Sequence, residues 1–150
     1  MVRLVYQILI GKASMLFFTQ NNIEIEYHSE TGIIEVRWIK ILQEEHLCTM
    51  WEEILKCIAK YNINYLLFDA SHLDYIPFLH HERTTLIFQT ELPITPLKKI
   101  AIILSEKVPN LLKIENLFRR YTHLNSPNLE FKLFHHHYEA LDWLLEFTKY

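Results

Sequence analysis

Glycine is scarce in this sequence, since only Gly11 and Gly32 occur among 150 residues. Phosphate-binding Walker loops, dinucleotide-binding fingerprints and the Gly-x-Ser-x-Gly elbow of many hydrolases each need glycines at short, fixed spacing. Neither glycine has a second one near enough to complete such a motif. The sequence therefore excludes nucleotide-binding enzymes and hydrolases that depend on these motifs.

Cysteine is equally rare, with Cys48 and Cys57 alone in the chain. Both fall in a segment with helical periodicity, which separates them by about 13 Å along the helix axis and on opposite sides. That distance is beyond disulfide reach, and no Cys-x-x-Cys spacing is present. We expect two inert thiols in a reducing compartment, and hence a cytoplasmic protein, rather than a redox or metal site.

The chain also lacks a basic excess and a long apolar run. Its 15 basic and 18 acidic residues give a net charge of −3, and the densest basic groups are the pairs Lys98-Lys99 and Arg119-Arg120. Nucleic-acid binding needs denser positive charge, so we expect none. The apolar stretch from Leu4 to Ile10 is far shorter than the ~18 residues of a membrane span, so we expect no stable membrane insertion.

Residues 1–19 are an extension of uncertain structure. The Leu4 to Ile10 stretch has the order of a short secretory signal, with Arg3 before it and Ala13-Ser14 after it. Two alternatives are an extra strand or helix at the edge of the domain, and an upstream start codon with the natural beginning at Met15. The sequence leaves these alternatives open.

The remaining residues have the length of a single domain and alternate strands with helices. Ile23 to His28 and Ile33 to Trp38 read as an antiparallel hairpin around Gly32, and apolar positions recur at three and four residues from Gln43 to Tyr61, as in a helix. Further strands are expected at 65–70, 100–104 and 129–134, and further helices from Pro77 to Leu92, from Pro109 to Leu124 and from Tyr138 to Phe147.

This order predicts an α/β fold with one mixed, largely parallel sheet of about five strands, an N-terminal antiparallel hairpin and flanking helices. Strands joined through helices need right-handed crossovers, which make them parallel. The run at 100–104 is apolar throughout, and the run at 65–70 is apolar except for a carboxylate near its C-terminal end, as expected of neighbouring central strands. Sites in such domains usually lie at the carboxyl ends of the strands, so Asp69 marks the expected site.

The sequence resembles the SpoIIAA-like group of STAS/Sec14-type domains over about residues 20–147. The matching segments are Ile-Glu-Val-Arg-Trp in the hairpin, Tyr-Leu-Leu-Phe-Asp-Ala-Ser-His-Leu from Tyr65, Lys-Lys-Ile-Ala-Ile-Ile-Leu-Ser from Lys98, and Phe134 followed by Tyr-Glu-Ala-Leu-Asp-Trp-Leu from Tyr138. The resemblance implies a non-enzymatic domain that binds a protein partner.

Some relatives are switched by phosphorylation of a serine in an Asp-Ser-Ser-Gly turn. The corresponding stretch here, Asp74-Tyr75-Ile76-Pro77-Phe78-Leu79, has neither serine nor glycine, so this switch is not carried over. Ser71 lies a few residues earlier and inherits no regulatory role.

The sequence supports a hydrolase triad and a histidine metal site less well than it supports structural roles for the same residues. Ser71, His72 and Asp74 have the residue types of a hydrolase triad but crowd into one loop, whereas working triads converge from separate segments. A turn in which Asp69, Ser71 and Asp74 bond to backbone groups explains them better. The nine histidines include no His-Glu-x-x-His motif, and helix initiation is favoured over metal binding for the triplet at 135–137.

The sequence therefore predicts a non-catalytic binding or regulatory domain, with no cofactor and no metal. The expected binding surface comprises Asp69, Ser71, His72, His80, His81 and Ser105. Its expected partner is a protein, and the sequence leaves homodimerisation open. The alternative function is a carrier or sensor of a lipid or other small apolar ligand, with the Phe78 to Leu92 helix as a lid over the cavity.

Overall fold

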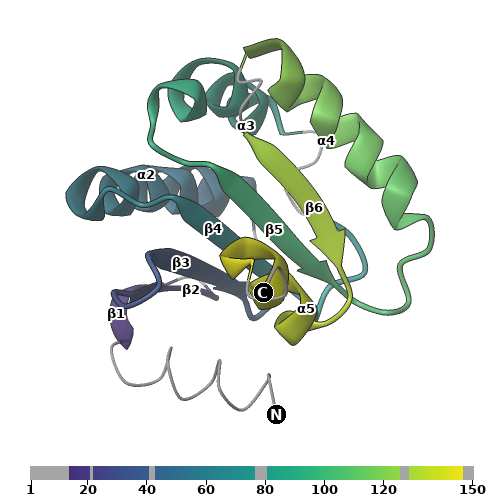
Figure 1. The fold of residues 1–150 in the computed structure, drawn as a ribbon, viewed down its shortest axis with the longest axis horizontal. Helices are drawn as coiled ribbons and strands as arrows, with labels where there is room; N and C mark the ends of the chain where they lie inside the picture. Colours follow the sequence, from purple (N-terminus) through teal and green to yellow (C-terminus); the bar gives the residue numbers. More distant parts are fainter. Residues whose placement is uncertain (1–13, 21, 41–42, 77–80, 126–128, 147–150) are drawn as a thin grey trace.

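The computed structural model describes residues 14–20, 22–40, 43–76, 81–125 and 129–146, which form an α/β domain around one mixed sheet (Figure 1). The strands are hydrogen-bonded in chain order, as β1 (Ser14–Gln20), β2 (Ile23–His28), β3 (Ile33–Trp38), β4 (Tyr65–Ala70), β5 (Lys99–Leu104) and β6 (Glu130–Phe134). Strand β2 is antiparallel to both of its neighbours, β1 and β3, and β3 to β6 are parallel. The predicted hairpin and the parallel pairing of β4 with β5 are confirmed.

The described residues form a sheet of six strands, so the prediction of about five is corrected. The additional strand is β1, which pairs with β2 from Ser14 opposite His28 to Gln20 opposite Ile23. This edge strand is one of the alternatives that the sequence left open for the N-terminal extension. Residues 1–13 lie outside the described part of the chain.

Helices cover both faces of the sheet (Figure 1). The long helix α2 (Glu44–Tyr61) packs on the larger core, and α4 (Leu111–Asn125) lies beside β6. On the opposite face, α5 (His137–Leu145) buries its apolar side chains against β4, β5 and β6. Successive side chains of each strand point to opposite faces of the sheet. Neighbouring residues of one strand therefore face α2 and α5 in turn.

The predicted helix from Pro77 to Leu92 is not one regular α-helix in the described part of the chain, and its predicted start lies outside that part. Residues 77–80 lie outside the described chain, and His81 has an extended backbone, with φ −82° and ψ 123°. The helix α3 (Glu82–Leu86) begins after it because the His81 ring accepts a hydrogen bond from the Thr84 backbone N–H. The chain continues as a π turn, η1 (Ile87–Glu91), and a 3-10 turn, η2 (Leu92–Ile94).

Aromatic side chains tie this segment to the sheet. Trp38 of β3 stacks on Phe68 of β4 with ring centroids 5.0 Å apart, and Trp51 of α2 meets Phe68 edge-on at 5.6 Å. Trp51 also meets Phe88 of η1 edge-on, and its buried indole N–H donates a 2.8 Å hydrogen bond to the Thr84 hydroxyl. The segment from α3 to η1 is therefore packed directly on the core.

Candidate functional site

A cluster of charged side chains lies on the α5 side of the sheet and begins with Glu35. The alternation of β3 directs Ile34, Val36 and Trp38 into the larger core, which leaves Glu35 and Arg37 on the opposite face. Glu35 is only 7% exposed. A carboxylate at this depth needs charged or hydrogen-bonding partners.

Glu35 has such a partner on each of its two oxygens. Its Oε1 accepts a 2.8 Å hydrogen bond from Nε2 of His137, the first residue of α5. Its Oε2 pairs with the guanidinium of Arg37. Arg37 also contacts two carboxylates of the neighbouring strand β2, Glu24 at 3.2 Å and Glu26 at 3.4 Å. The buried carboxylate is therefore held between an imidazole and a guanidinium.

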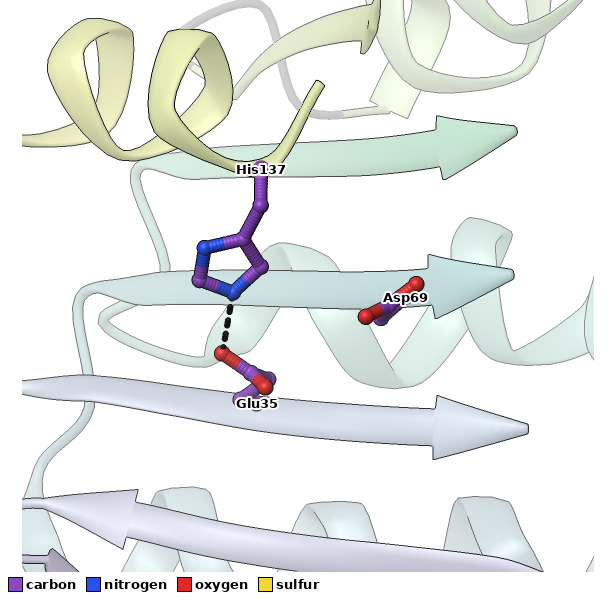
Figure 2. A group of neighbouring side chains, drawn as sticks. All are labelled: Glu35, Asp69 and His137. Atoms are coloured by element: carbon purple, nitrogen blue, oxygen red, sulfur yellow. Dashed lines mark hydrogen bonds and ion pairs between the residues drawn. The ribbon is translucent and has the colours of Figure 1, made fainter. Parts of the chain in front are cut away.

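Asp69 of β4 brings a second carboxylate to the same place. Oxygen atoms of Glu35 and Asp69 and a ring nitrogen of His137 all lie within 4.8 Å of one another. Figure 2 shows the three side chains, which come from β3, β4 and α5, gathered on one face of the sheet. Asp69 also accepts a 3.0 Å hydrogen bond from the backbone N–H of Ser71, so the turn predicted from the sequence is present at this residue.

The electrostatics of the cluster favour its charged forms. Burial acting alone would raise the pKa of Glu35, but the hydrogen bond and charge of His137 and the charge of Arg37 outweigh it and lower the pKa to about 2. Burial acting alone would lower the pKa of His137, yet its hydrogen bond to Glu35 and the charges of Glu35 and Asp69 raise it. At neutral pH Glu35 is an anion, and His137 is more readily protonated than an exposed imidazole.

A second feature is an open groove at the carboxyl ends of β3 and β4, with a volume of about 620 Å³. Ile39 and Tyr75 line it and are 45% and 46% exposed, while Leu73 beside them is buried. The other lining residues are polar: Asn22, Lys40, His72 and Asp74. Exposed apolar side chains flanked by polar ones are typical of an interaction surface.

The residues predicted from the sequence have different places in the structure. Asp69 and Ser71 share the hydrogen bond described above, and His72 lines the groove. Ser105 accepts a hydrogen bond from the Lys107 N–H in the turn after β5. His81 caps α3 and lies 3.7 Å from Glu44 of α2, while His80 lies outside the described residues. The predicted surface thus divides into a groove residue, turn residues and a helix cap.

The suspected hydrolase grouping gains no support from the geometry. Within the described chain, no hydrogen bond joins the side chains of Ser71, His72 and Asp74 to one another. His137 does start a helix, as the sequence suggested for the histidine triplet. Sequence reasoning missed its pairing with Glu35, and it missed Arg37 as the partner on the other side. The sequence signal was the alternation of the charged residues Glu35 and Arg37 with apolar residues in β3.

No helix in the described part of the chain combines the length and the apolar character that a membrane crossing requires. Comparison with protein-family models, with curated proteins and with solved structures found no match to this chain.

Proposed function

We propose that this chain is a non-catalytic regulatory domain of the SpoIIAA-like type, which binds a protein partner through the groove at the carboxyl ends of β3 and β4. The observation that carries the proposal is the pair of half-exposed apolar side chains, Ile39 and Tyr75, which line the groove together with the buried Leu73. These side chains would lose contact with water on binding, which favours association.

The chemistry of the groove favours a protein segment as its occupant. Lys40 and Asp74 are exposed at its rim and carry opposite charges, and His72 adds a further polar group. A peptide with one apolar side chain between residues of opposite charge would satisfy the apolar floor and both charged groups. A purely apolar ligand such as a lipid chain would desolvate the charges without pairing them.

The alternative function, a carrier with the second helix as a lid, has no comparable observation in its favour. The segment that would open is tied to α2 through Trp51, which contacts both Thr84 and Phe88. Opening it would expose Phe88 and break a buried hydrogen bond, which together cost several kcal/mol by ordinary estimates of about 1 to 3 kcal/mol for each such contact.

Site-specific photo-crosslinking in the native cells tests the proposal. A photoreactive phenylalanine analogue replaces Tyr75 in one strain, Ile39 in a second and Leu112 in a third. Leu112 is an apolar side chain on α4 that is 65% exposed, so it matches the chemistry of the groove positions without lying in the groove. We expect the same protein adduct from positions 75 and 39 and not from position 112.

A second measurement identifies the contact as specific. The adducted partner, once sequenced, should bind the purified chain in solution, and Tyr75→Ser combined with Ile39→Ser should weaken that binding at least about tenfold. Equal adducts from all three positions, or no adduct from either groove position, would refute the proposal. So would a partner that binds the double variant as tightly as the natural sequence.

A further inference from the structure

We propose that Glu35, Asp69 and His137 form a binding site for a divalent first-row transition-metal ion, with Zn²⁺ as the reference case. No part of this proposal depends on the groove or on its partner. The three side chains come from β3, β4 and α5, so the fold brings together residues that are up to 102 positions apart in the sequence.

The donor set matches such an ion in its chemistry. One imidazole nitrogen and two carboxylate oxygens are ligands that Zn²⁺, Mn²⁺ and Fe²⁺ accept, whereas Mg²⁺ and Ca²⁺ prefer oxygen donors alone. The two carboxylates also balance the charge of a divalent ion. Because the donors are neither all oxygen nor all sulfur, the set selects this class of ion over alkaline-earth ions and over soft Cu⁺.

The distances are close to what coordination requires. Metal–ligand bonds of about 2.1 Å place two ligands of one ion at most about 4.2 Å apart. The three donor atoms lie within 4.8 Å of one another, so no pair of them needs to come closer by more than about 0.6 Å to reach that limit. Small rotations of the Asp69 and His137 side chains supply that movement, because neither is fully buried.

The surrounding residues suit a metal site. Arg37 holds Oε2 of Glu35, which fixes that carboxylate and leaves Oε1 directed at His137. Arg37 is in turn held by Glu24 and Glu26, so it need not move when an ion replaces the proton between Oε1 and Nε2. Hydrogen-bonded carboxylates of this kind orient metal ligands in many proteins.

An ion can reach the cluster from solvent, and the Asp69 side chain has an oxygen atom that no described residue hydrogen-bonds. The His137 side chain is 40% exposed, so an ion can reach the cluster from solvent. Asp69 uses Oδ1 to accept the Ser71 N–H bond, and among the described residues none hydrogen-bonds to its Oδ2. That oxygen is available to an incoming cation without loss of an existing contact.

Calorimetric titration of the purified chain with Zn²⁺ tests the site. Asp69→Asn and His137→Gln each remove one donor but keep a polar side chain of similar size. His136→Gln is the matched control, because it removes the neighbouring imidazole, which contacts Glu106 and Glu139 instead. We expect one Zn²⁺ to bind the natural sequence and the control equally, and at least about tenfold weaker binding by each site variant.

Two further readouts keep the test decisive. Addition of Mn²⁺ to the isotopically labelled chain should broaden the amide signals nearest Glu35, Asp69 and His137 first, and Mg²⁺ in excess should not displace Zn²⁺. Far-ultraviolet circular dichroism confirms that each variant is folded. Equal Zn²⁺ affinity in all four proteins, broadening centred on histidines other than His137 and its neighbour in the cluster, His28, or no binding up to about 1 mM would overturn the proposal.

Discussion

Replacing His137 with glutamine removes the imidazole that pairs with the buried Glu35 and should weaken folding by an amount that depends on pH. At a hydrogen-bond distance of 2.8 Å the two charges are centred about 4 Å apart. Such a pair interacts by about 1 kcal/mol in a water-like medium and by about 4 kcal/mol near a protein surface. Because the His137 side chain is 40% exposed, we expect the lower figure, about 1 kcal/mol in the free energy of unfolding.

The sign of the pH dependence follows from the direction of the pKa shift. Burial acting alone would lower the pKa of His137, but its hydrogen bond to Glu35 and the nearby carboxylate charges raise it above 6.5 in the folded chain. The resulting stabilisation is complete below the unfolded-state pKa and is lost as pH rises through the folded-state pKa. Urea denaturation should therefore separate the natural sequence from His137→Gln by about 1 kcal/mol near pH 5.5, with the difference shrinking toward pH 9.

Two controls separate this effect from a general change at the start of α5. His136→Gln removes the adjacent histidine, which has no contact with Glu35 in the described structure. The change in unfolding free energy between pH 5.5 and pH 9 should therefore be the same in this variant as in the natural sequence. Glu35→Gln should abolish most of the effect of His137→Gln in a double-mutant cycle. A difference that is constant across pH, or additive effects in the cycle, would contradict the pairing of His137 with Glu35.

Three further predictions concern acid, a buried hydrogen bond and a thiol. The pKa of Glu35 is lowered from 4.5 to about 2, so the stabilisation that its charged form provides should be lost as pH falls through that range. Glu35→Gln should flatten this part of an acid-unfolding curve, and an unchanged curve would contradict the lowered pKa of Glu35. Thr84→Val removes the hydroxyl that accepts the buried indole N–H of Trp51 and should cost about 1 to 3 kcal/mol in chemical denaturation, while Thr84→Ser costs clearly less; equal losses would argue against the bond. Burial raises the pKa of the Cys57 thiol to about 12, so a thiol reagent should label the half-exposed Cys48 in the folded chain and Cys57 only on unfolding; rapid labelling of both would contradict the burial.

Local patterns in the sequence predicted most of the sheet. The apolar runs that became β4 and β5 are buried on both faces, and the 3.6-residue periodicity of α2 places Trp51 and Ile54 in the core. The edge strand β1 left a weaker signal, because it pairs on one side only and does not alternate cleanly between apolar and polar residues. The start of α3 depended on the His81 cap, a single contact that hydrophobic periodicity does not reveal.

Local sequence patterns could not predict the charged cluster, because its residues are distant from one another in the sequence. Glu35 and His137 are 102 residues apart, and their contact depends on how α5 crosses the sheet after β6. The alternation of β3 does indicate that Glu35 shares a face with Ile33, but it does not show that the helix begins beside it. Glu35 and Arg37 alternate with the apolar residues of β3, and a carboxylate that the fold buries there needs a partner.

Asp69 links the two proposed sites, and this determines how they must be tested. One of its oxygens holds the Ser71 N–H at the start of the loop that carries His72 and Tyr75, while the side chain also faces Glu35 and His137. Asp69→Asn therefore disturbs the cation site and, through the loop, the groove. Tyr75→Ser acts on the groove alone and His137→Gln on the cation site alone. If a metal ion draws Asp69 toward His137, its binding and partner binding must change each other's affinity by the same factor. Titrating Zn²⁺ with and without the crosslinked partner's peptide measures that factor, and a factor of one would mean that the loop does not couple the sites.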